Sequence, residues 1–279
     1  MTTIQEIVKI LTDAGIEQNE ANIEVKLLIE HYCNYTTKDI ILGNKPDYNK
    51  LEIVKAKALH RAETREPIQY IIGLADFMGE KFLVNPSVLI PRDETELLVR
   101  KAIDIINTNN LKKAIDVGTG SGCIACMVAK YTDCQVVGVD ISTDALNTAL
   151  DNASRLNLNN KAIFRKSDIF SNVKPSEKFD IIISNPPYIP FSEKDNLQRE
   201  VRFEPETALF AEDDGVNLYL RMSSEAPNVL NKYGHLIFEI GINQSERVSQ
   251  IMRDAGFTNI EIIKDLAGID RVIHGQLSS

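Results

Sequence analysis

Apolar residues follow two different patterns along the chain, and the change between them predicts two kinds of architecture. Up to about residue 70, apolar positions recur three and four residues apart, as in Ile4, Ile7, Val8 and Leu11, which is the spacing of amphipathic helices. From residue 112 onward, short apolar runs alternate with amphipathic stretches. The pattern therefore predicts a helical N-terminal segment followed by alternating strands and helices.

The N-terminal segment predicts four short helices and no strand. Thr2 and Thr3 stand three residues before Gln5 and Glu6, a capping-box pattern that predicts the start of the first helix. The apolar positions of the four helices lie in residues 4–11, 23–32, 40–42 and 51–59, with stops at Gly15, at Gly43 and before Pro67. Short helices with close connections indicate a small bundle. Because it has no metal-ligand spacing and no glycine-rich loop, we interpret it as a recognition or scaffold domain.

Residues 75–91 predict a β-hairpin or an extended linker. Apolar residues such as Phe77 and Phe82 are interrupted by Gly79 and Asn85-Pro86, which are typical turn residues. A helix is predicted from Thr95 to about residue 108. We therefore expect an N-terminal helical domain over residues 1–74, a hairpin linker over 75–91 and a further domain over 92–279.

The alternation in the last domain predicts an α/β fold with a doubly wound, mostly parallel sheet. Strands are expected at 114–117, 136–139, 162–164, 179–184, 235–240, 260–263 and 271–274, and helices at 123–131, 143–156, 216–230 and 244–255. Only residues 265–270 separate the last two strands, and this is too short for a helical crossover. These two strands must therefore pair antiparallel.

A glycine-rich turn follows the first predicted strand of this domain. Residues 116–122 spell Asp-Val-Gly-Thr-Gly-Ser-Gly, and glycine lets the backbone approach a ligand closely. The spacing Gly-x-Gly-x-Gly differs from the Gly-x-Gly-x-x-Gly of dinucleotide sites, and no lysine follows it as in a phosphate-binding loop. Taken alone, the turn is equally compatible with a tight strand-to-helix connection.

Two aspartates at the ends of the next strands support a nucleoside site. Asp140 stands about 20 residues after the glycines, where a carboxylate can bind both ribose hydroxyls. Asp168 ends the third strand, where it can accept a hydrogen bond from an adenine amino group while Ile169 packs on the ring. Each aspartate alone could be a helix N-cap. Three consecutive strand ends with compatible chemistry predict the nucleoside site.

The fourth strand leads into Asn185-Pro186-Pro187-Tyr188 at the same edge of the sheet. A planar amide or exocyclic amine needs its hydrogens held by acceptors before its lone pair can attack a methyl group. The Asn185 side-chain oxygen and the Pro186 carbonyl can be those acceptors, prolines stiffen the backbone, and Tyr188 offers a ring for stacking. Asp116 suits a cationic group near the glycine turn, which favours a sulfonium cofactor over a pyrophosphate.

At this point the chain resembles a class I S-adenosylmethionine-dependent methyltransferase with an Asn-Pro-Pro-Tyr catalytic loop. Further segments resemble the peptide chain release factor glutamine methyltransferases, often called the HemK or PrmC family. These segments are Glu66–Gly73, Leu89–Glu96, Phe203–Leu209, Phe238–Gly241 and Asp265–Val272. The resemblance covers nearly the whole chain and is weakest over the N-terminal bundle.

The resemblance implies methylation of the glutamine side-chain amide in the Gly-Gly-Gln loop of class 1 release factors. It implies that the cofactor is bound by Gly118, Thr119, Gly120, Ser121, Gly122, Asp140, Ile141, Asp168, Ile169 and Asn185. The substrate amide would be held by Asn185, Pro186, Pro187 and Tyr188, and the helical domain would contact a second surface of the release factor. The fold would be Rossmann-like with the last strand antiparallel. No metal is expected.

The composition of the chain bears on its binding partners and on its cellular location. The net charge is −9 and the pI about 5.1, which disfavours non-specific binding of nucleic acid. Arg61, Arg65, Arg92, Arg100 and Lys101 could form a local basic patch, although solvated helix faces are favoured. The N-terminal residues have no signal-peptide pattern, no apolar stretch is long enough to span a membrane and the four cysteines form no disulfide framework, so we expect a cytoplasmic protein. We also expect a monomer. Cys123-Ile-Ala-Cys126 is interpreted as core packing, not as a redox or zinc site.

Four other functions remain open from the sequence. The first is a glutamine methyltransferase that acts on a ribosomal protein, since the pocket would be the same. The second is a nucleic-acid adenine or guanine methyltransferase, which would need a basic groove and base flipping. A binding module with a dead site is disfavoured by the intact Asn185–Tyr188 loop. A nicotinamide dehydrogenase is disfavoured by the missing Gly-x-Gly-x-x-Gly.

Overall fold

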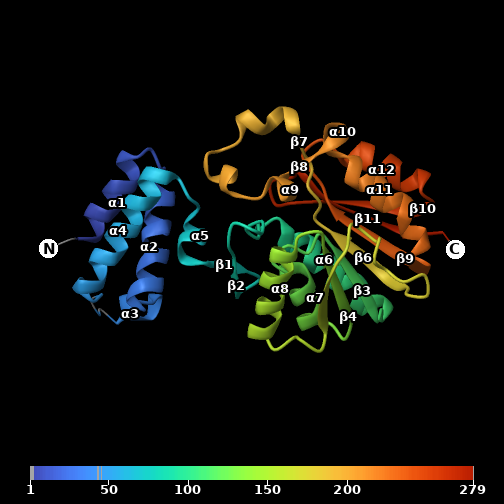
Figure 1. Ribbon diagram of the computed structural model, residues 1–279, viewed down its shortest axis with the longest axis horizontal. Coiled ribbons are helices and arrows are strands. Elements are labelled where there is room, and N and C mark those ends of the chain that lie inside the picture. Colours follow the sequence, from blue (N-terminus) through green and yellow to red (C-terminus); the bar gives the residue numbers. More distant parts are fainter. Residues whose placement is uncertain (1–2, 43, 45, 279) are drawn as a thin grey trace. The chain divides into compact units, whose positions relative to one another are not determined.

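A computed structural model of the protein describes residues 3–42, 44 and 46–278, in two compact units. The smaller unit comprises Met1–Gly73 and Gln198–Phe203, and the larger one Leu74–Leu197 and Glu204–Ser279. Each unit has its own buried apolar core. Figure 1 shows the helices of the smaller unit and the sheet and helices of the larger one. The predictions made for Thr2 and Gly43 fall outside the described residues.

The smaller unit is helical, as its apolar pattern predicted. Its helices are α1 (Ile4–Asp13), α2 (Gln18–Cys33), α3 (Thr37–Ile41), α4 (Tyr48–Thr64) and α5 (Ile68–Ile72), with the 3₁₀ turn η2 (Glu200–Phe203). The predicted capping box is present at Thr3, whose hydroxyl accepts from the Glu6 amide while the Glu6 carboxylate accepts from the Thr3 amide. Helix α4 ends before Pro67, and the short α5 was not predicted because five residues carry too little periodicity.

A buried arginine links parts of the smaller unit that are distant in sequence. Arg61 on α4 is 1% exposed, and its guanidinium donates to Glu24 on α2 and to Glu200. Arg65 also pairs with Glu200, at 2.6 Å. Burial of a charge is tolerated only with partners of this kind. The interpretation of Arg61 as part of a solvated helix face is therefore wrong.

All five cations considered for a basic patch are paired with carboxylates. Arg61 pairs with Glu24 and Glu200, Arg65 with Glu200, Arg92 with Glu204, Arg100 with Glu96 and Lys101 with Glu261. Their positive charge is thus locally compensated.

The larger unit begins with the predicted hairpin and contains a seven-stranded sheet. The hairpin strands are β1 (Leu74–Phe77) and β2 (Glu80–Leu83), which pair antiparallel. The sheet has the order β10 (Phe257–Lys264), β11 (Asp270–Leu277), β9 (Leu230–Glu239), β6 (Phe179–Ser184), β3 (Lys113–Val117), β4 (Gln135–Asp140) and β5 (Ala162–Lys166). Strand β11 runs opposite to the other six strands of this sheet, and it lies between β9 and the edge strand β10. The doubly wound, mostly parallel sheet with an antiparallel last strand is therefore confirmed.

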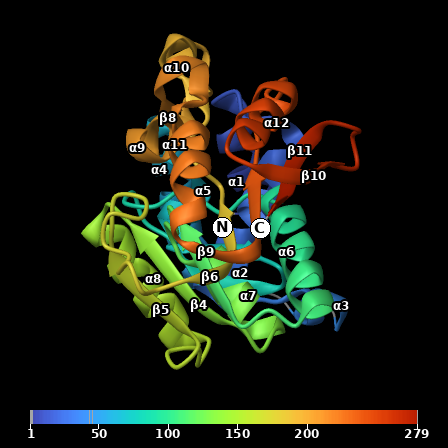
Figure 2. The same cartoon turned by 90° about the vertical axis from the view of Figure 1, so that its right-hand side faces the viewer.

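Helices cover both faces of this sheet (Figure 2). One face carries α6 (Thr95–Asn109), α7 (Cys123–Tyr131) and α8 (Thr143–Arg155), and the other carries α11 (Asn217–Glu225) and α12 (Ser245–Asp254). Successive residues of a strand point to opposite faces. Accordingly, Ile181 and Ile183 of β6 pack with α6 and α7, whereas Ile182 packs with α11.

The helix predicted over residues 216–230 is too long. Helix α11 ends at Glu225, the 3₁₀ turn η3 (Ala226–Asn228) follows, and β9 begins at Leu230. Pro227 has no amide hydrogen to donate within a continuing helix, which explains the early end. Leu230 instead pairs with Phe179 of β6 as the first residue of β9.

The segment between β6 and α11 contains short elements that the apolar pattern did not predict. They are β7 (Ile189–Pro190), η1 (Phe191–Asn196), α9 (Glu206–Leu209), β8 (Phe210–Ala211) and α10 (Glu212–Gly215), with β7 parallel to β8. Elements of two to six residues are too short to show a period.

The cysteine pair of α7 lies in the core, as interpreted. Cys123 and Cys126 are buried among apolar residues, and burial raises the pKa of the Cys123 thiol to about 12. Within residues 3–42, 44 and 46–278, no three His, Cys, Asp or Glu side chains are grouped to hold a metal ion. No helix of that part of the chain combines the length and hydrophobicity needed to cross a membrane.

The packing of β6 yields a stability prediction. Ile182 is 0% exposed in the centre of the sheet, whereas Ile163 on the edge strand β5 is 44% exposed. We expect Ile182→Ala to lower the free energy of unfolding by about 2–5 kcal/mol, because it leaves a cavity. Ile163→Ala, the matched control, should cost about 1 kcal/mol or less. Urea denaturation of the variants measures the difference, and equal losses would contradict this packing.

Candidate active site

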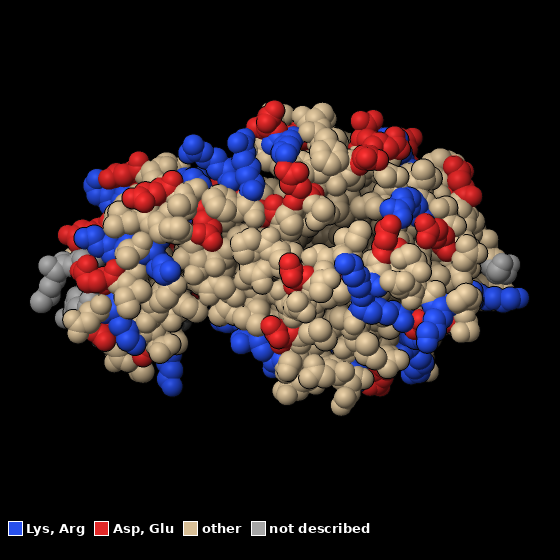
Figure 3. Space-filling model, in the orientation of Figure 1, with Lys and Arg blue, Asp and Glu red and all other residues tan. Residues whose placement is uncertain are grey.

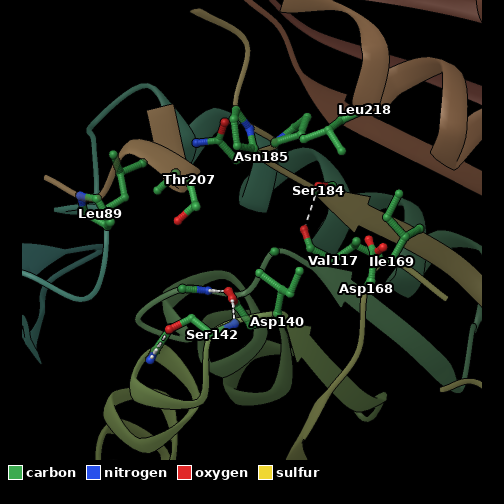
Figure 4. Close-up of a pocket in the computed structure, with 18 of the residues that line it drawn as sticks. Leu89, Val117, Asp140, Ser142, Asp168, Ile169, Ser184, Asn185, Thr207 and Leu218 are labelled. Carbon is green, nitrogen blue, oxygen red and sulfur yellow. Dashed lines mark hydrogen bonds between the residues drawn. The ribbon is translucent and has the colours of Figure 1, made fainter. Parts of the chain in front are cut away.

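A cavity of about 370 Å³ lies where the carboxyl ends of β3, β4, β5 and β6 meet (Figure 4). In open parallel sheets, this edge is where ligands bind. Val117, Asp140, Asp168 and Ser184, at or just beyond the ends of these strands, all contribute to the wall. The volume is within the ordinary range for a small-molecule site.

The glycine turn after β3 takes backbone conformations that favour glycine. Gly118 has a φ of 73° and Gly120 a φ of 54°, and both line the cavity. Gly122 lies behind them, where a Cβ atom would be 2.9 Å from the Cβ of Ala149. The three glycines therefore differ in purpose: two form the wall of the cavity, and the third lets α7 approach α8.

Asp140 at the end of β4 holds the turn in place. One carboxylate oxygen accepts from the Gly120 amide at 2.9 Å, and the other accepts from the Ser142 amide at 2.9 Å. Each carboxylate oxygen can accept a second hydrogen bond. Because Asp140 also lines the cavity, as Figure 4 shows, both oxygens are placed to accept from a vicinal diol such as that of a ribose.

Asp168 and Ile169 also line the cavity, but Asp168 has a partner that the sequence did not reveal. Both of its oxygens accept from Nη2 of Arg221 on α11, at 3.2 and 3.1 Å. An adenine amino group would therefore share this carboxylate with Arg221. Ile169 is buried with a φ of 49°, which is unfavourable for a β-branched residue. Such a conformation costs on the order of 1–3 kcal/mol and persists only where the surroundings impose it.

The catalytic loop predicted after β6 contributes three of its four residues to the wall. Asn185, Pro186 and Pro187 line the cavity, and Asn185 is drawn at its edge in Figure 4. The preceding Ser184 is 0% exposed and donates from Oγ to the Val117 carbonyl at 2.6 Å. This bond ties the end of β6 to the end of β3.

Tyr188 is not among the residues that line the cavity. Its ring packs against the α11 face of the core, and its hydroxyl lies 3.5 Å from the buried Glu239 carboxylate. Burial raises the pKa of the Tyr188 phenol. In this geometry Tyr188 supports the loop from behind.

Several other predicted residues are near the cavity but outside its wall. Thr119, Ser121 and Gly122 are not among the lining residues, and Thr119 and Ser121 are buried. Asp116 is also buried, and its Oδ2 accepts from the Thr119 hydroxyl at 2.6 Å and from the Ala125 amide at 3.2 Å. Burial raises the pKa of Asp116 to about 7. Asp116 thus anchors the turn and the start of α7, and it is not among the residues that line the cavity.

Part of the wall comes from segments to which the sequence assigned no site residue. Val88 and Leu89 contribute from the linker, Thr207 from α9 and Leu218 from α11. Glu204, which is 5% exposed, joins the segment that contains Thr207 to the segment that follows Leu89. Its carboxylate accepts from the Ile90 amide at 3.1 Å and pairs with Arg92. The sequence pointed to the Phe203–Leu209 segment only through the family resemblance. No residue in it has a chemistry that would have marked it as part of the cavity wall.

The cavity fits S-adenosylmethionine by the chemistry of its wall. Asp140 presents acceptors for a ribose diol, Ile169 and Leu218 are apolar surfaces for a purine ring, and the Gly118 turn leaves room for a chain close to the backbone. The acidic residues also suit a ligand that carries a sulfonium charge.

Comparison with solved structures agrees with this fold. The catalytic domain of hMettl16, solved in complex with the MAT2A 3′UTR hairpin 6, superposes with a TM-score of 0.57 at 16% sequence identity, over 85% of this chain and 86% of that one. At this identity the likeness shows the fold alone, which is Rossmann-like. The class follows from the match of residues 93–202 to the methyltransferase small domain and from the sequence relatives: the protein is a methyltransferase that uses S-adenosylmethionine.

Sequence relatives identify the family. Residues 2–73 match the model of the PrmC N-terminal domain, and residues 93–202 match that of the methyltransferase small domain. The chain is 41% identical to the release factor glutamine methyltransferase of Koribacter versatilis, over 79% of this chain and 78% of the relative. It is 37% identical to that of Neisseria gonorrhoeae, over 91% and 93%. The chain belongs to the family of release factor glutamine methyltransferases.

A second group of relatives is longer. The bifunctional methyltransferase of Rickettsia bellii is 34% identical over 91% of this chain, which spans 51% of that relative's length.

The geometry of Asp140 yields a binding prediction. We expect Asp140→Ala to weaken S-adenosylmethionine binding about tenfold or more, because hydrogen bonds to a charged group contribute about 1.5–3 kcal/mol. Asp144→Ala on the exposed first turn of α8 is the matched control and should leave affinity unchanged. Isothermal titration calorimetry measures both, and an unaltered affinity of the Asp140 variant would exclude it as a ligand of the ribose.

Proposed function

We propose that this enzyme methylates the side-chain amide nitrogen of the glutamine in the Gly-Gly-Gln motif of class 1 peptide chain release factors. The observation that carries the proposal is the position of Asn185 at the edge of the cavity, in a chain of this family. S-adenosylmethionine, when bound, supplies an electrophilic methyl group. The residues of the chain must then orient a weakly nucleophilic amide.

The loop after β6 has the groups for this orientation. An amide nitrogen is planar and its lone pair is delocalised, so its two hydrogens must be held for the lone pair to face the methyl group. We assign one hydrogen to the Asn185 Oδ1 and the other to the Pro186 carbonyl. Pro186 and Pro187 restrict the backbone and so reduce the entropy lost in reaching a reactive geometry. Tyr188, packed on the core, fixes the far end of the loop.

We assign recognition of a second surface of the release factor to the N-terminal unit. The described residues of that unit include exposed large apolar side chains on four helices: Ile4 on α1, Ile23 on α2, Ile41 on α3, and Ile53 and Leu59 on α4. Exposed apolar groups of this kind are common in protein-binding surfaces. The assignment gives residues 1–74 to recognition and 92–279 to catalysis. Because class 1 release factors act on cytoplasmic ribosomes, the enzyme would act in the cytoplasm.

A nucleic-acid substrate is less compatible with the charge distribution. The five candidate cations are paired, and the net charge is −9. On the larger unit, acidic and basic side chains lie beside one another on the face shown in Figure 3. Binding of a phosphate backbone needs a concentration of uncompensated positive charge.

The first test concerns the loop. We expect Asn185→Ala to reduce methyl transfer by about a hundredfold or more, as for loss of a group that positions reacting atoms. Affinity for S-adenosylmethionine should remain within a fewfold of the native value. Asn160→Ala, in an exposed turn after α8, serves as the control. Retained activity in the Asn185 variant would refute its role as the amide acceptor.

The second test concerns the substrate. Tritium-labelled S-adenosylmethionine is incubated with purified release factor, with the same factor carrying asparagine in place of the motif glutamine, with ribosomal proteins and with DNA. We expect label only on the native release factor. Label on ribosomal protein or DNA, with none on release factor, would establish one of the alternative substrates.

A further inference from the structure

Two buried residues behind the catalytic loop, Thr95 and Glu239, are hydrogen-bonded to one another and are not among the residues that line the cavity. Thr95, at the start of α6, is 3% exposed, and its Oγ1 donates to Oε2 of Glu239 at 2.6 Å. Glu239 ends β9 and is 2% exposed. On its other side, Thr95 Oγ1 accepts from Nδ2 of Asn185 at 3.2 Å. The chain therefore runs from Asn185 through Thr95 to Glu239.

The direction of these hydrogen bonds follows from the chemistry of the groups. An ionised carboxylate can only accept, so the Thr95 hydroxyl must use its single proton on Glu239. Thr95 Oγ1 is then left with acceptor capacity alone and can bind only the amino group of Asn185. Among residues 3–42, 44 and 46–278, no group donates a hydrogen bond to the Asn185 Oδ1, which remains available to a ligand.

We propose that Thr95 and Glu239 are positioning residues that fix the amide orientation of Asn185, so that its oxygen and not its amino group faces the substrate. The inference rests on the proposed function, because the oxygen is needed to accept a hydrogen from the glutamine amide. If the Asn185 side-chain amide were rotated by 180°, its amino hydrogens would face the hydrogens of the substrate amide. Asn185 could then not orient the lone pair of the substrate nitrogen.

The state of Glu239 controls this directionality. If Glu239 is protonated, it can donate to Thr95, and the Thr95 hydroxyl can then donate to Asn185 Oδ1. The Asn185 amide then loses its preference for one orientation. Methyl transfer should therefore depend on ionised Glu239.

The groups around Glu239 place its titration near neutrality. Burial is the largest effect, and with the nearby Glu94 it raises the pKa of Glu239 to about 7. The Thr95 hydroxyl, Arg271 on β11 and the Tyr188 hydroxyl oppose the rise, and Arg271 is already paired with Asp265.

Two more titratable groups face Glu239 from other elements. Tyr219 on α11 donates to the Glu239 carbonyl, and the thiol of Cys123 on α7 has its pKa raised in part by this carboxylate. Both are neutral at pH 7, since burial raises their pKa values. We therefore expect kcat to fall as the pH drops below about 7, because Glu239 then takes up a proton.

The decisive variants differ in hydrogen-bonding capacity but not in size. Thr95→Val removes the hydroxyl at nearly constant volume, and we expect kcat to fall about tenfold to a hundredfold, as for a misplaced catalytic group. Affinity for S-adenosylmethionine should be unchanged. Thr95→Ser keeps the hydroxyl and should restore kcat to within about threefold of the native value. Thr258→Val on the exposed part of β10 is the control.

Glu239→Gln tests the pH dependence, with the exposed Glu246→Gln on α12 as its control. A glutamine amide does not titrate, so the Glu239 variant should have a low kcat without the fall near pH 7 that the native enzyme shows. Persistence of that fall in the Glu239 variant, or native kcat in Thr95→Val, would overturn the inference.

One measurement is independent of the substrate. In ¹H–¹⁵N spectra, the Asn185 side-chain amide should have one proton protected from solvent exchange, and Thr95→Val should remove the protection. Protection with no methylation of release factor by the native enzyme would refute the proposed function alone. Methylation by the native enzyme with no protection would refute the positioning role alone.

Discussion

The hydrogen bond from the Ser184 hydroxyl to the Val117 carbonyl joins the two loops on which the site depends. It connects the ends of β6 and β3, which are neighbours in the sheet, at 2.6 Å and with no exposure of Ser184 to solvent. The glycine turn begins directly after Val117, and Asn185 directly follows Ser184. The distance between the glycine turn and Asn185 is thus set by strand pairing, which is rigid, and not by a flexible loop.

Two buried carboxyl groups support the site from the face of the sheet that α6 and α7 cover. Asp116 holds the glycine turn through Thr119 and the amide of Ala125, and Glu239 holds Thr95 behind Asn185. Burial raises the pKa of each to about 7. A buried carboxyl group destabilises a fold unless it is hydrogen-bonded. Asp116 and Glu239 are hydrogen-bonded in this way, and each of them holds a group that lies next to the cavity wall.

Ion pairing accounts for the arginines that the sequence left ambiguous. Arg61 is enclosed in the smaller unit by Glu24 and Glu200, which lies 139 residues away in the chain. In the larger unit, Arg92 and Glu204 join the linker to the segment that contains Thr207. Removing one partner of a buried pair leaves an uncompensated charge, at a cost of about 3–5 kcal/mol. These cations therefore serve the architecture and not a polyanionic ligand.

The sequence by itself determined the helical bundle, the hairpin, the parallel sheet with its antiparallel last strand, and the strand ends that carry Gly118, Asp140, Asp168 and Asn185. Periodicity and strand-end chemistry are local properties, so they are visible in a linear pattern. Only the tertiary structure decided that Arg221 shares Asp168, that Tyr188 lies behind the cavity, and that Thr95 and Glu239 meet Asn185. Thr95 and Glu239 are 144 residues apart, and no local rule relates a helix start to the end of a distant strand. Such contacts arise when the sheet is assembled and its helices pack on it, because the order of strands in space differs from their order in the chain.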